Sequence, residues 1–324
     1  MRNSKIISVA PMMDWTDSHC RYFMRLLNPN ILLYSEMITA EALLYGNAKK
    51  YLHFNNQEHP IALQLGGSDP CKLKQSAILA EDEGYDEVNL NIGCPSERVQ
   101  KGSFGACLMA EPNLVADCVD GMKNAVDIPI SVKTRIGIDN NDSYEFLSNF
   151  IKTVSEAKCS KFIIHARKAI LSGLSPKDNR SIPPLNYERV FQIKSDFEHL
   201  SIILNGGIKT IDDCKDNLKK LDGVMIGRHA YHNPWFLHEL KSLNESTKDD
   251  QINRDDIIER MYPYIQDQLN KGTQLNHITR HMLGLYKNEP GARSWRRYLS
   301  THAHHSDAGI EVLQNALKIL PKVA

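Results

Sequence analysis

The chain has 324 residues, of which 42% are hydrophobic and 24% are charged, a balance typical of folded globular proteins. Lysine plus arginine and aspartate plus glutamate both number 39, so the formal net charge of zero excludes general attraction to nucleic acid or acidic membranes. The length exceeds what one ordinary domain needs, and it suits an α/β barrel of about 250 residues with an appended domain.

Neither export nor membrane insertion is indicated by the sequence. The first apolar run, residues 6–10, is shorter than the roughly 7–15-residue core of a signal peptide. No run approaches the roughly 18 residues of a membrane span. We therefore expect a cytoplasmic protein that makes no membrane contact.

The 7 cysteines are scattered and never spaced as C-x-x-C, which argues against a disulfide framework, a zinc ribbon and an iron–sulfur cluster. His302, His304 and His305 lack a cysteine or carboxylate at metal-ligand spacing, so no metal is expected. Most of the cysteines should be buried small apolar residues.

Short apolar runs alternate with helical stretches over residues 1–243. The runs predicted as strands are Ile6–Ala10, Leu32–Glu36, Ile61–Leu65, Glu87–Asn91, Ile130–Lys133, Phe162–His165, Ile202–Asn205 and Gly223–Ile226. The stretches with helical spacing include Cys71–Glu83, Leu114–Ala125, Tyr144–Ala157, Ile211–Leu218 and Pro234–Lys241. This alternation predicts a parallel sheet, and its repetition favours a closed (β/α)8 TIM barrel over an open doubly wound sheet. No G-x-G-x-x-G follows the first run, which disfavours a dinucleotide-binding fold.

A second domain is predicted after a polar stretch at residues 244–251, which has the composition of a linker. Ile257, Ile258, Met261 and Ile265 then recur at helical spacing. Asn253 or Asp255 is placed to cap the first of these helices. The sequence thus predicts a catalytic barrel over 1–243 and a small all-helical domain over 252–324.

The ends of the predicted strands carry polar residues or glycines all around the barrel. They include Gln64, Asn89, Asn91, Cys94, Lys133, His165, Asn205 and Arg228. Because the active site of a (β/α)8 barrel lies at the carboxyl ends of its strands, this series favours a functional pocket over accidental polar strand ends.

Two of these ends indicate a phosphate site. Asn205-Gly206-Gly207 and Gly227-Arg228 are glycine turns that lead into helical stretches. Glycines let backbone N–H groups approach an anion, and a helix N-terminus favours negative charge. Either turn alone would equally serve as a simple tight turn, but together they favour phosphate.

The segment Asn89–Ser96, with Cys94 at its centre, resembles the catalytic motif of the tRNA-dihydrouridine synthases. Further segments resemble the same family in the family's order: residues 10–17, 132–137, 164–167, 204–208 and 227–228. Residues 173–180 and 291–297 resemble its A subfamily in particular. The resemblance covers nearly the whole chain.

The resemblance implies an FMN enzyme that uses NADPH to reduce the C5=C6 bond of D-loop uridines, at sites 20 and 20a of tRNA. Hydride passes from the flavin to C6, and Cys94 gives a proton to C5. The implied FMN contacts are Pro11, Met12, Met13, Gln64, Lys133, His165, Asn205, Gly206, Gly207, Gly227 and Arg228, with Lys168 a weaker candidate. Lysine suits the negative charge of a reduced flavin, and a glutamine amide suits the flavin's pyrimidine edge.

The resemblance also implies contacts with tRNA. Lys177 and Arg180 form one basic pair and Arg293 and Arg296 another, while Asn91 is expected to touch the substrate nucleotide. The second pair belongs to residues 280–305, where five basic residues face one acid: Arg280, Lys287, Arg293, Arg296 and Arg297 against Glu289. The uridine must be flipped out to react, and Trp15 or Tyr34 would either stack on it or belong to the core.

Two other functions fit parts of this pattern. One is an FMN barrel that acts on a free small molecule, such as a dihydroorotate-type dehydrogenase, although the basic helical domain argues against it. The other is a tRNA-binding protein without important catalysis, which would not need Cys94, Lys133 and the glycine turns together. The sequence does not fix the oligomeric state, and a monomer is expected.

Overall fold

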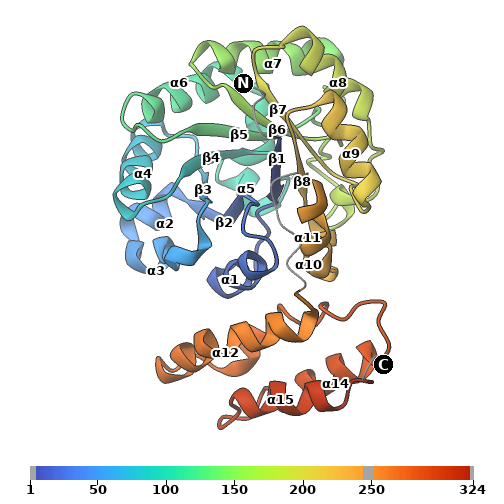
Figure 1. The fold of residues 1–324 in the computed structure, drawn as a ribbon. Coiled ribbons are helices and arrows are strands. Elements are labelled where there is room, and N and C mark those ends of the chain that lie inside the picture. The colour runs from blue at the N-terminus through green and yellow to red at the C-terminus, as the bar shows by residue number, and fades with distance from the viewer. Residues whose placement is uncertain (1–4, 244–251, 322–324) are drawn as a thin grey trace. The chain divides into compact units, whose positions relative to one another are not determined.

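The computed structural model describes residues 5–243 and 252–321, so the predicted linker at 244–251 lies outside the described residues. The chain divides into two compact units. The barrel unit comprises Met1–Met13 and Ile31–Gly227, and the helical unit comprises Asp14–Asn30 and Arg228–Ala324. Figure 1 shows the strands of the barrel unit ringed by helices, and the helical unit built from helices alone.

The barrel unit contains one eight-stranded sheet with the order β1-β8-β7-β6-β5-β4-β3-β2, and all its ladders are parallel. The strands are β1 (Ile6–Val9), β2 (Leu33–Thr39), β3 (Ile61–Gly66), β4 (Glu87–Ile92), β5 (Ile130–Arg135), β6 (Lys161–His165), β7 (Ser201–Asn205) and β8 (Gly223–Ile226). Backbone hydrogen bonds of 3.0 Å from Val9 to Leu32 and from Leu32 to Ile7 join β1 to the start of β2. The sheet therefore closes, and the predicted TIM barrel is confirmed.

Helices connect successive strands of the barrel. They are α2 (Ala40–Tyr45), α3 (Ala48–Leu52), α4 (Pro70–Glu83), α5 (Glu97–Lys101), α6 (Pro112–Lys123), α7 (Tyr144–Glu156), α8 (Tyr187–Asp196) and α9 (Ile211–Lys220). Capping explains several starts: Asp69 accepts from the backbone of Cys71 and Lys72 before α4, and Ser143 accepts from Phe146 before α7. The four helices predicted here, α4, α6, α7 and α9, agree closely with the structure, whereas α2, α3, α5 and α8 had no prediction.

The strands are buried on both faces, as parallel strands covered by helices should be. In β6, for example, Phe162, Ile163 and Ile164 are all fully buried. Buried apolar side chains from six of the strands or their ends form a hydrophobic cluster. This cluster consists of Ala10, Tyr34, Ala62, Ile163, Ile203 and Met225. The interior is thus a packed core that supports a site at one end.

The helical unit is built from α1 (Ser18–Leu27), α10 (Arg228–His232), α11 (Trp235–Glu239), α12 (Arg254–Asn270), α13 (Leu275–Thr279), α14 (Ala292–His302) and α15 (Ile310–Lys318). Asn253 caps α12, as one of the two predictions had it. The periodic residues Ile257, Ile258, Met261 and Ile265 are fully buried. Their burial accounts for the helical pattern in the sequence.

The helical unit also takes in α1, α10 and α11, which the sequence-based division placed within residues 1–243. Long-range contacts account for this grouping. The Asn28 side chain donates to the Leu237 carbonyl at 2.8 Å, and the Tyr22 ring stacks on Tyr264 with 3.9 Å between centroids. Such contacts leave no periodic signal in the sequence.

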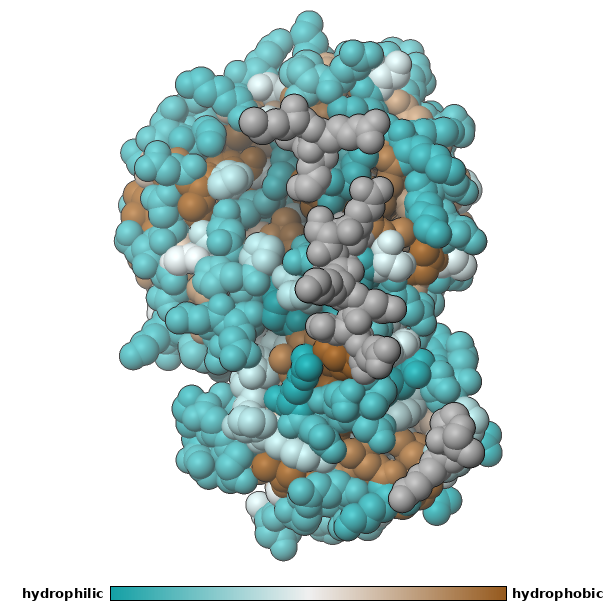
Figure 2. Space-filling view, viewed as in Figure 1, coloured by the Kyte–Doolittle hydropathy of each residue, from teal (hydrophilic) through white to brown (hydrophobic). Residues whose placement is uncertain are grey.

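Hydrophilic residues cover most of the surface visible in Figure 2, with apolar residues showing between them. Among the described residues, no helix is both long and apolar enough to cross a membrane.

Candidate active site

The register of the sheet brings the predicted site residues together at the carboxyl ends of the strands. Gln64 pairs with Asn89, Asn91 with Lys133, and His165 with Asn205. Pro11, Met12 and Met13 follow β1 directly, and Gly227 follows β8. Pro11 and Met12 are partly exposed and Met13 is exposed, as residues that line an open end should be.

The Cys94 segment is held by its backbone. Asn91 Oδ1 accepts hydrogen bonds of 3.0 Å from the backbone N–H groups of both Gly93 and Cys94. The Cys94 carbonyl accepts from the Ala106 N–H at 2.9 Å. The thiol is half-buried, and it lies 3.6 Å from Ser96 Oγ. The backbone of the Cys94 segment is thus held in place by hydrogen bonds that do not involve the sulfur.

A row of hydrogen-bonded side chains runs from this segment down through the barrel. Asn91 Nδ2 donates to Gln64 Oε1 at 2.9 Å, and Gln64 Nε2 donates to Asn89 Oδ1 at 2.7 Å. Asn89 Nδ2 then donates to Ser131 Oγ at 2.8 Å, and Ser131 donates to Glu87. We call these five residues, Asn91, Gln64, Asn89, Ser131 and Glu87, the interior row.

Glu87, the charged end of the interior row, determines which group donates and which accepts in each hydrogen bond of the row. Glu87 is buried, and its carboxylate forms an ion pair of 2.6 Å with Lys161 while accepting from the Tyr34 hydroxyl at 3.2 Å. An ionised carboxylate only accepts, so Ser131 must donate to it and accept from Asn89. Every amide above is oriented in turn, which leaves Asn91 with its oxygen toward the Cys94 segment.

Lys133 supplies an unpaired positive charge at the strand ends. No described residue forms a hydrogen bond or ion pair with its ammonium group. Burial lowers the pKa of Lys133 to about 7, and repulsion from Arg135 contributes to the lowering. An anion bound at this end would compensate the cost of the buried charge.

Arg135 acts as a structural tie beside Lys133. Its Nε donates to the Gly93 carbonyl at 2.9 Å, and its Nη1 donates to the carbonyls of Lys168 and Asn179 at 3.1 and 2.9 Å. Burial lowers the pKa of Arg135 to about 10, which leaves the guanidinium charged at neutral pH. Arg135 thereby joins the Cys94 segment to the loop after β6.

The first glycine turn packs tightly against His165. Gly206 has φ +109°, and a Cβ there would stand 2.7 Å from His165 Cδ2. Gly207 has φ +79°, and a Cβ there would stand 2.5 Å from the Tyr187 hydroxyl. Both glycines thus let the backbone pass close to neighbouring side chains, an approach that a larger residue would block.

Side chains of the same segment cap the helix that follows these glycines. Thr210 and Asp213 cap α9 reciprocally, and Asp213 also accepts from the Lys209 N–H at 3.0 Å. Asp212 and Asp213 place acidic side chains in the first turn. These caps satisfy the N–H groups of Lys209, Thr210 and Asp213, so we expect an anion at this turn to bind the glycine backbone that precedes the helix.

Gly227 differs from Gly206 in what surrounds it. Its φ lies outside the left-handed region, and the nearest described atom to an added Cβ is the Ala10 Cβ at 3.9 Å. Neither the backbone nor packing therefore requires glycine at this position. A side chain at Gly227 would therefore have space, whereas one at Gly206 would collide with His165.

Three secondary candidates have structural roles. Lys168 forms an ion pair of 2.9 Å with Asp142, so it braces the loop after β6. Tyr34 is buried and bonded to Glu87, which places it in the core. The Trp15 ring stacks on Tyr231 with 4.3 Å between centroids, within the helical unit.

The predicted basic pairs are exposed in their own units. Lys177 and Arg180 lie on the loop between β6 and α8, and Arg293 and Arg296 lie three residues apart on α14. Two of the charges counted for residues 280–305 are paired with residues outside that stretch. Arg280 forms an ion pair of 2.5 Å with Asp17, and Glu289 forms one of 2.8 Å with Arg254. The basic surface of α14 thus depends on arginines that have no acidic partner among the described residues.

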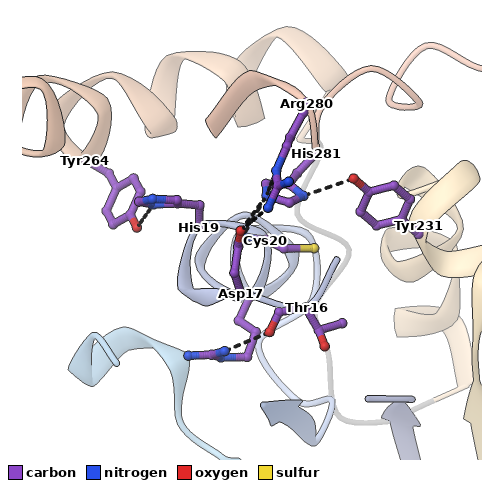
Figure 3. Close-up of polar contacts among 9 residues, drawn as sticks. Thr16, Asp17, His19, Cys20, Tyr231, Tyr264, Arg280 and His281 are labelled. Atoms are coloured by element: carbon purple, nitrogen blue, oxygen red, sulfur yellow. Dashed lines mark hydrogen bonds and ion pairs between the residues drawn. The ribbon is translucent and has the colours of Figure 1, made fainter. Parts of the chain in front are cut away.

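Figure 3 shows the polar cluster that contains Arg280. His281 Nε2 lies 3.0 Å from Asp17 Oδ1, and its Nδ1 lies 3.2 Å from the Tyr231 hydroxyl. Burial alone would raise the pKa of Asp17, but His281, the Cys20 N–H and Arg280 hold it well below its ordinary value. Asp17 also caps α1, so the cluster fixes α1 within the helical unit.

Sequence reasoning missed Glu87 and Ser131, and it placed Arg135 at the end of its strand without giving it a role. Glu87 and its partner Lys161 are the first residues of buried strands, a position that resembles a solvent-exposed strand start. The sequence signal that could have revealed Glu87 is that opposite charges, Glu87 and Lys161, begin β4 and β6. Arg135 was visible as a charged residue at the end of β5.

Comparison with known proteins gives this geometry its context. Residues 8–320 match the sequence model of the dihydrouridine synthase (Dus) family. The chain is 58% identical over 327 aligned positions to the tRNA-dihydrouridine(20/20a) synthase of Vibrio parahaemolyticus serotype O3:K6 (strain RIMD 2210633), covering 99% of each chain. It is 58% identical over 314 residues to the protein of the same name from Escherichia coli (strain K12), covering 97% of this chain and 91% of that one.

A third relative with that name, from Shewanella oneidensis, is 58% identical over 312 residues, which cover 96% of this chain and 93% of the relative. The family's sequence model extends from β1 to beyond α15, so it takes in the strand ends, the Cys94 segment and the C-terminal helices alike. The chain belongs to the dihydrouridine synthase family of oxidoreductases.

Proposed function

We propose that this protein reduces uridines 20 and 20a in the D-loop of tRNA to 5,6-dihydrouridine, using FMN and NADPH. The observation that carries the proposal is the Cys94 segment, held by Asn91 beside the unpaired Lys133 at one end of the barrel. The names of the relatives give the substrate class and the two positions.

The residues at the strand ends fit a flavin mononucleotide. Lys133 provides a positive charge for the ring system, and the turn at Gly206 and Gly207, which carries no Cβ, lets the backbone approach the phosphate. The carbonyl of Gln64 is occupied by Asn91, which leaves an N–H of its amide for the pyrimidine edge. Pro11, Met12, Met13, His165, Asn205, Gly227 and Arg228 complete the proposed cofactor residues. Bound FMN, reduced by NADPH, supplies the hydride that adds to C6 of uracil.

Cys94 acts in this proposal as the acid that protonates C5. A thiol that carries its proton can donate it to a carbon that gains electron density in the transition state. The proton leaves the sulfur as the C5–H bond forms, while hydride adds to C6, so the double bond is reduced by two electrons. Asn91 acts through Cys94 as a positioning residue, because its oxygen already accepts from two backbone N–H groups.

The tRNA must present an extruded uridine to this site, at the cost of unstacking the base. Basic side chains that neutralise phosphates offset that cost. We assign this role to Lys177 and Arg180 on the barrel unit and to Arg293 and Arg296 on the helical unit. All four are exposed.

The function is tested by mapping dihydrouridine in tRNA from a strain that lacks the gene. We expect uridine to persist at positions 20 and 20a and dihydrouridine to return on complementation. The purified protein should also show flavin absorption. Unchanged dihydrouridine in the deletion strain would overturn the proposal, and turnover of free dihydroorotate instead of tRNA would favour the small-molecule dehydrogenase.

The two glycine turns provide a matched test of the cofactor site. Gly206→Ala forces a side chain into a left-handed backbone and against His165, so we expect a loss of roughly 1–3 kcal/mol in stability together with weaker FMN binding. Gly227→Ala meets no such obstacle, so it should keep the melting temperature and weaken FMN binding alone. Thermal unfolding and flavin titration measure both. If Gly227→Ala binds FMN normally, the cofactor does not approach that turn.

A further inference from the structure

The most exposed large apolar side chain in the described chain is Tyr45, at 75%. Tyr51, also exposed at 41%, packs close by, because a Cβ on Gly46 would stand 3.3 Å from the Tyr51 ring. Both tyrosines lie on the connection between β2 and β3, which contains α2 and α3 (Figure 1). An exposed aromatic pair of this kind indicates a binding surface rather than a core.

The charge around these tyrosines is positive. Lys49 and Lys50 lie between them in the sequence, are exposed, and form no ion pair within the described residues. No acidic residue occurs from position 45 to position 54. The neighbouring Glu41 is already paired with Lys72 at 2.6 Å. We call Tyr45, Lys49, Lys50 and Tyr51 the α2–α3 patch.

α2, which ends at Tyr45, starts at the catalytic end of the barrel unit. α2 begins at Ala40, directly after the carboxyl end of β2. A Cβ on Gly66, at the end of β3, would stand 2.9 Å from the Phe104 ring and 3.1 Å from Met37 Sδ. The ends of β2 and β3 therefore contact the segment that follows Cys94.

Other exposed apolar side chains occur at the same end of the barrel unit. Met13 follows β1 and is 56% exposed, and Ile182 follows β6 and is 63% exposed. The end that carries Cys94 thus exposes apolar side chains from several strand connections. Such an end suits a macromolecular ligand better than a small one.

We propose that the α2–α3 patch binds the substrate tRNA. Tyr45 stacks on an unpaired base next to the extruded uridine, and Lys49 and Lys50 neutralise backbone phosphates. The proposal rests on the proposed function, and it adds a contact surface separate from the arginines of α14. Aromatic faces combined with unpaired lysines are the chemistry of single-stranded RNA binding. A protein partner is disfavoured, because lysine is depleted at the centres of protein interfaces.

The test measures binding of an unmodified tRNA transcript to the flavin-loaded full-length protein at several salt concentrations. Tyr45→Ala should weaken binding by about 5- to 100-fold, whereas Tyr45→Phe, which keeps the aromatic face, should bind nearly as wild type. The double variant Lys49→Ala with Lys50→Ala should reduce the slope of log affinity against log salt by about one for each phosphate that is no longer neutralised.

A matched control removes two lysines elsewhere. Lys123 on α6 and Lys152 on α7 lie near the ends of helices that lead back toward the amino ends of β5 and β6. Neither forms an ion pair with a described residue, so Lys123→Ala with Lys152→Ala changes the net charge equally and should leave the salt slope unchanged.

Steady-state kinetics separates this proposal from the proposed function. The patch variants should raise KM for tRNA and leave the rate at saturating tRNA near that of wild type. If wild type reduces tRNA but the patch variants match the control pair, the patch does not bind tRNA and the function stands. If wild type does not reduce tRNA at all, the proposed function itself fails. A change in oligomeric state without a change in tRNA affinity would assign the patch to a protein contact.

Discussion

Cys94→Ala is expected to lower the rate of uridine reduction by about 100- to 10,000-fold, the usual contribution of a general acid. The fold and flavin binding should survive, because Asn91 and Ala106 hold the backbone of this segment and the thiol forms a hydrogen bond with Ser96 alone among the described side chains. Single-turnover oxidation of the NADPH-reduced enzyme by tRNA measures the affected step. Reduction of the flavin by NADPH should proceed normally.

The control for this experiment is Cys71→Ala. Cys71 is an exposed free cysteine on α4, so its removal tests whether a general loss of thiol matters. We expect it to behave as wild type. Full activity in Cys94→Ala would place the proton donor elsewhere and would remove the central residue of the proposed mechanism.

Lys133→Met is expected to weaken FMN binding by about 10- to 100-fold while raising the melting temperature of the cofactor-free protein at pH 7. The pKa of Lys133 is lowered to about 7 in the folded chain, mainly by burial, against about 10.4 for an unfolded lysine. Between these values the unfolded chain binds more protons, so this group makes the cofactor-free wild type more stable as pH rises through that window. The methionine variant should lack this contribution.

Two measurements check the prediction for Lys133. Thermal unfolding of both cofactor-free proteins is measured from below pH 7 upward. The difference between their melting temperatures should narrow as pH increases. Flavin affinity of the wild type should decline as pH rises above the pKa of the lysine, and that of the variant should not. Equal affinity of both proteins at pH 6 would show that Lys133 does not contact the cofactor.

The barrel was predictable because its strands are buried on both faces and carry continuous apolar runs. The predicted strand boundaries were wrong where the burial of the residues changes along a strand. β2 continues past Glu36 to Thr39, with an irregular register between Tyr34 and Met37, and the polar Glu36 concealed that continuation. The short helices α2 and α3 were missed because helices of five or six residues show little periodicity.

The site was predictable as far as it follows the ends of strands. Gln64, Asn91, Lys133 and His165 are visible there because each lies at or near the end of an apolar run. Their partners were not visible, since strand register relates residues that are distant in the chain. The same limit applies to Arg280. The sequence suggests a solvent-exposed charge there, because its partner Asp17 lies 263 residues away in the chain.

The interior row has a consequence for how the enzyme can change. Each side-chain amide in the row donates one hydrogen bond and accepts another. The carboxylate of Glu87 can only accept, so it permits only one direction of donation along the row. An exchange at one position therefore leaves its neighbours mismatched unless they change as well. Across relatives these residues should be inherited as a block, and an engineer who grafts the Cys94 segment onto another barrel must transplant its support down to Lys161.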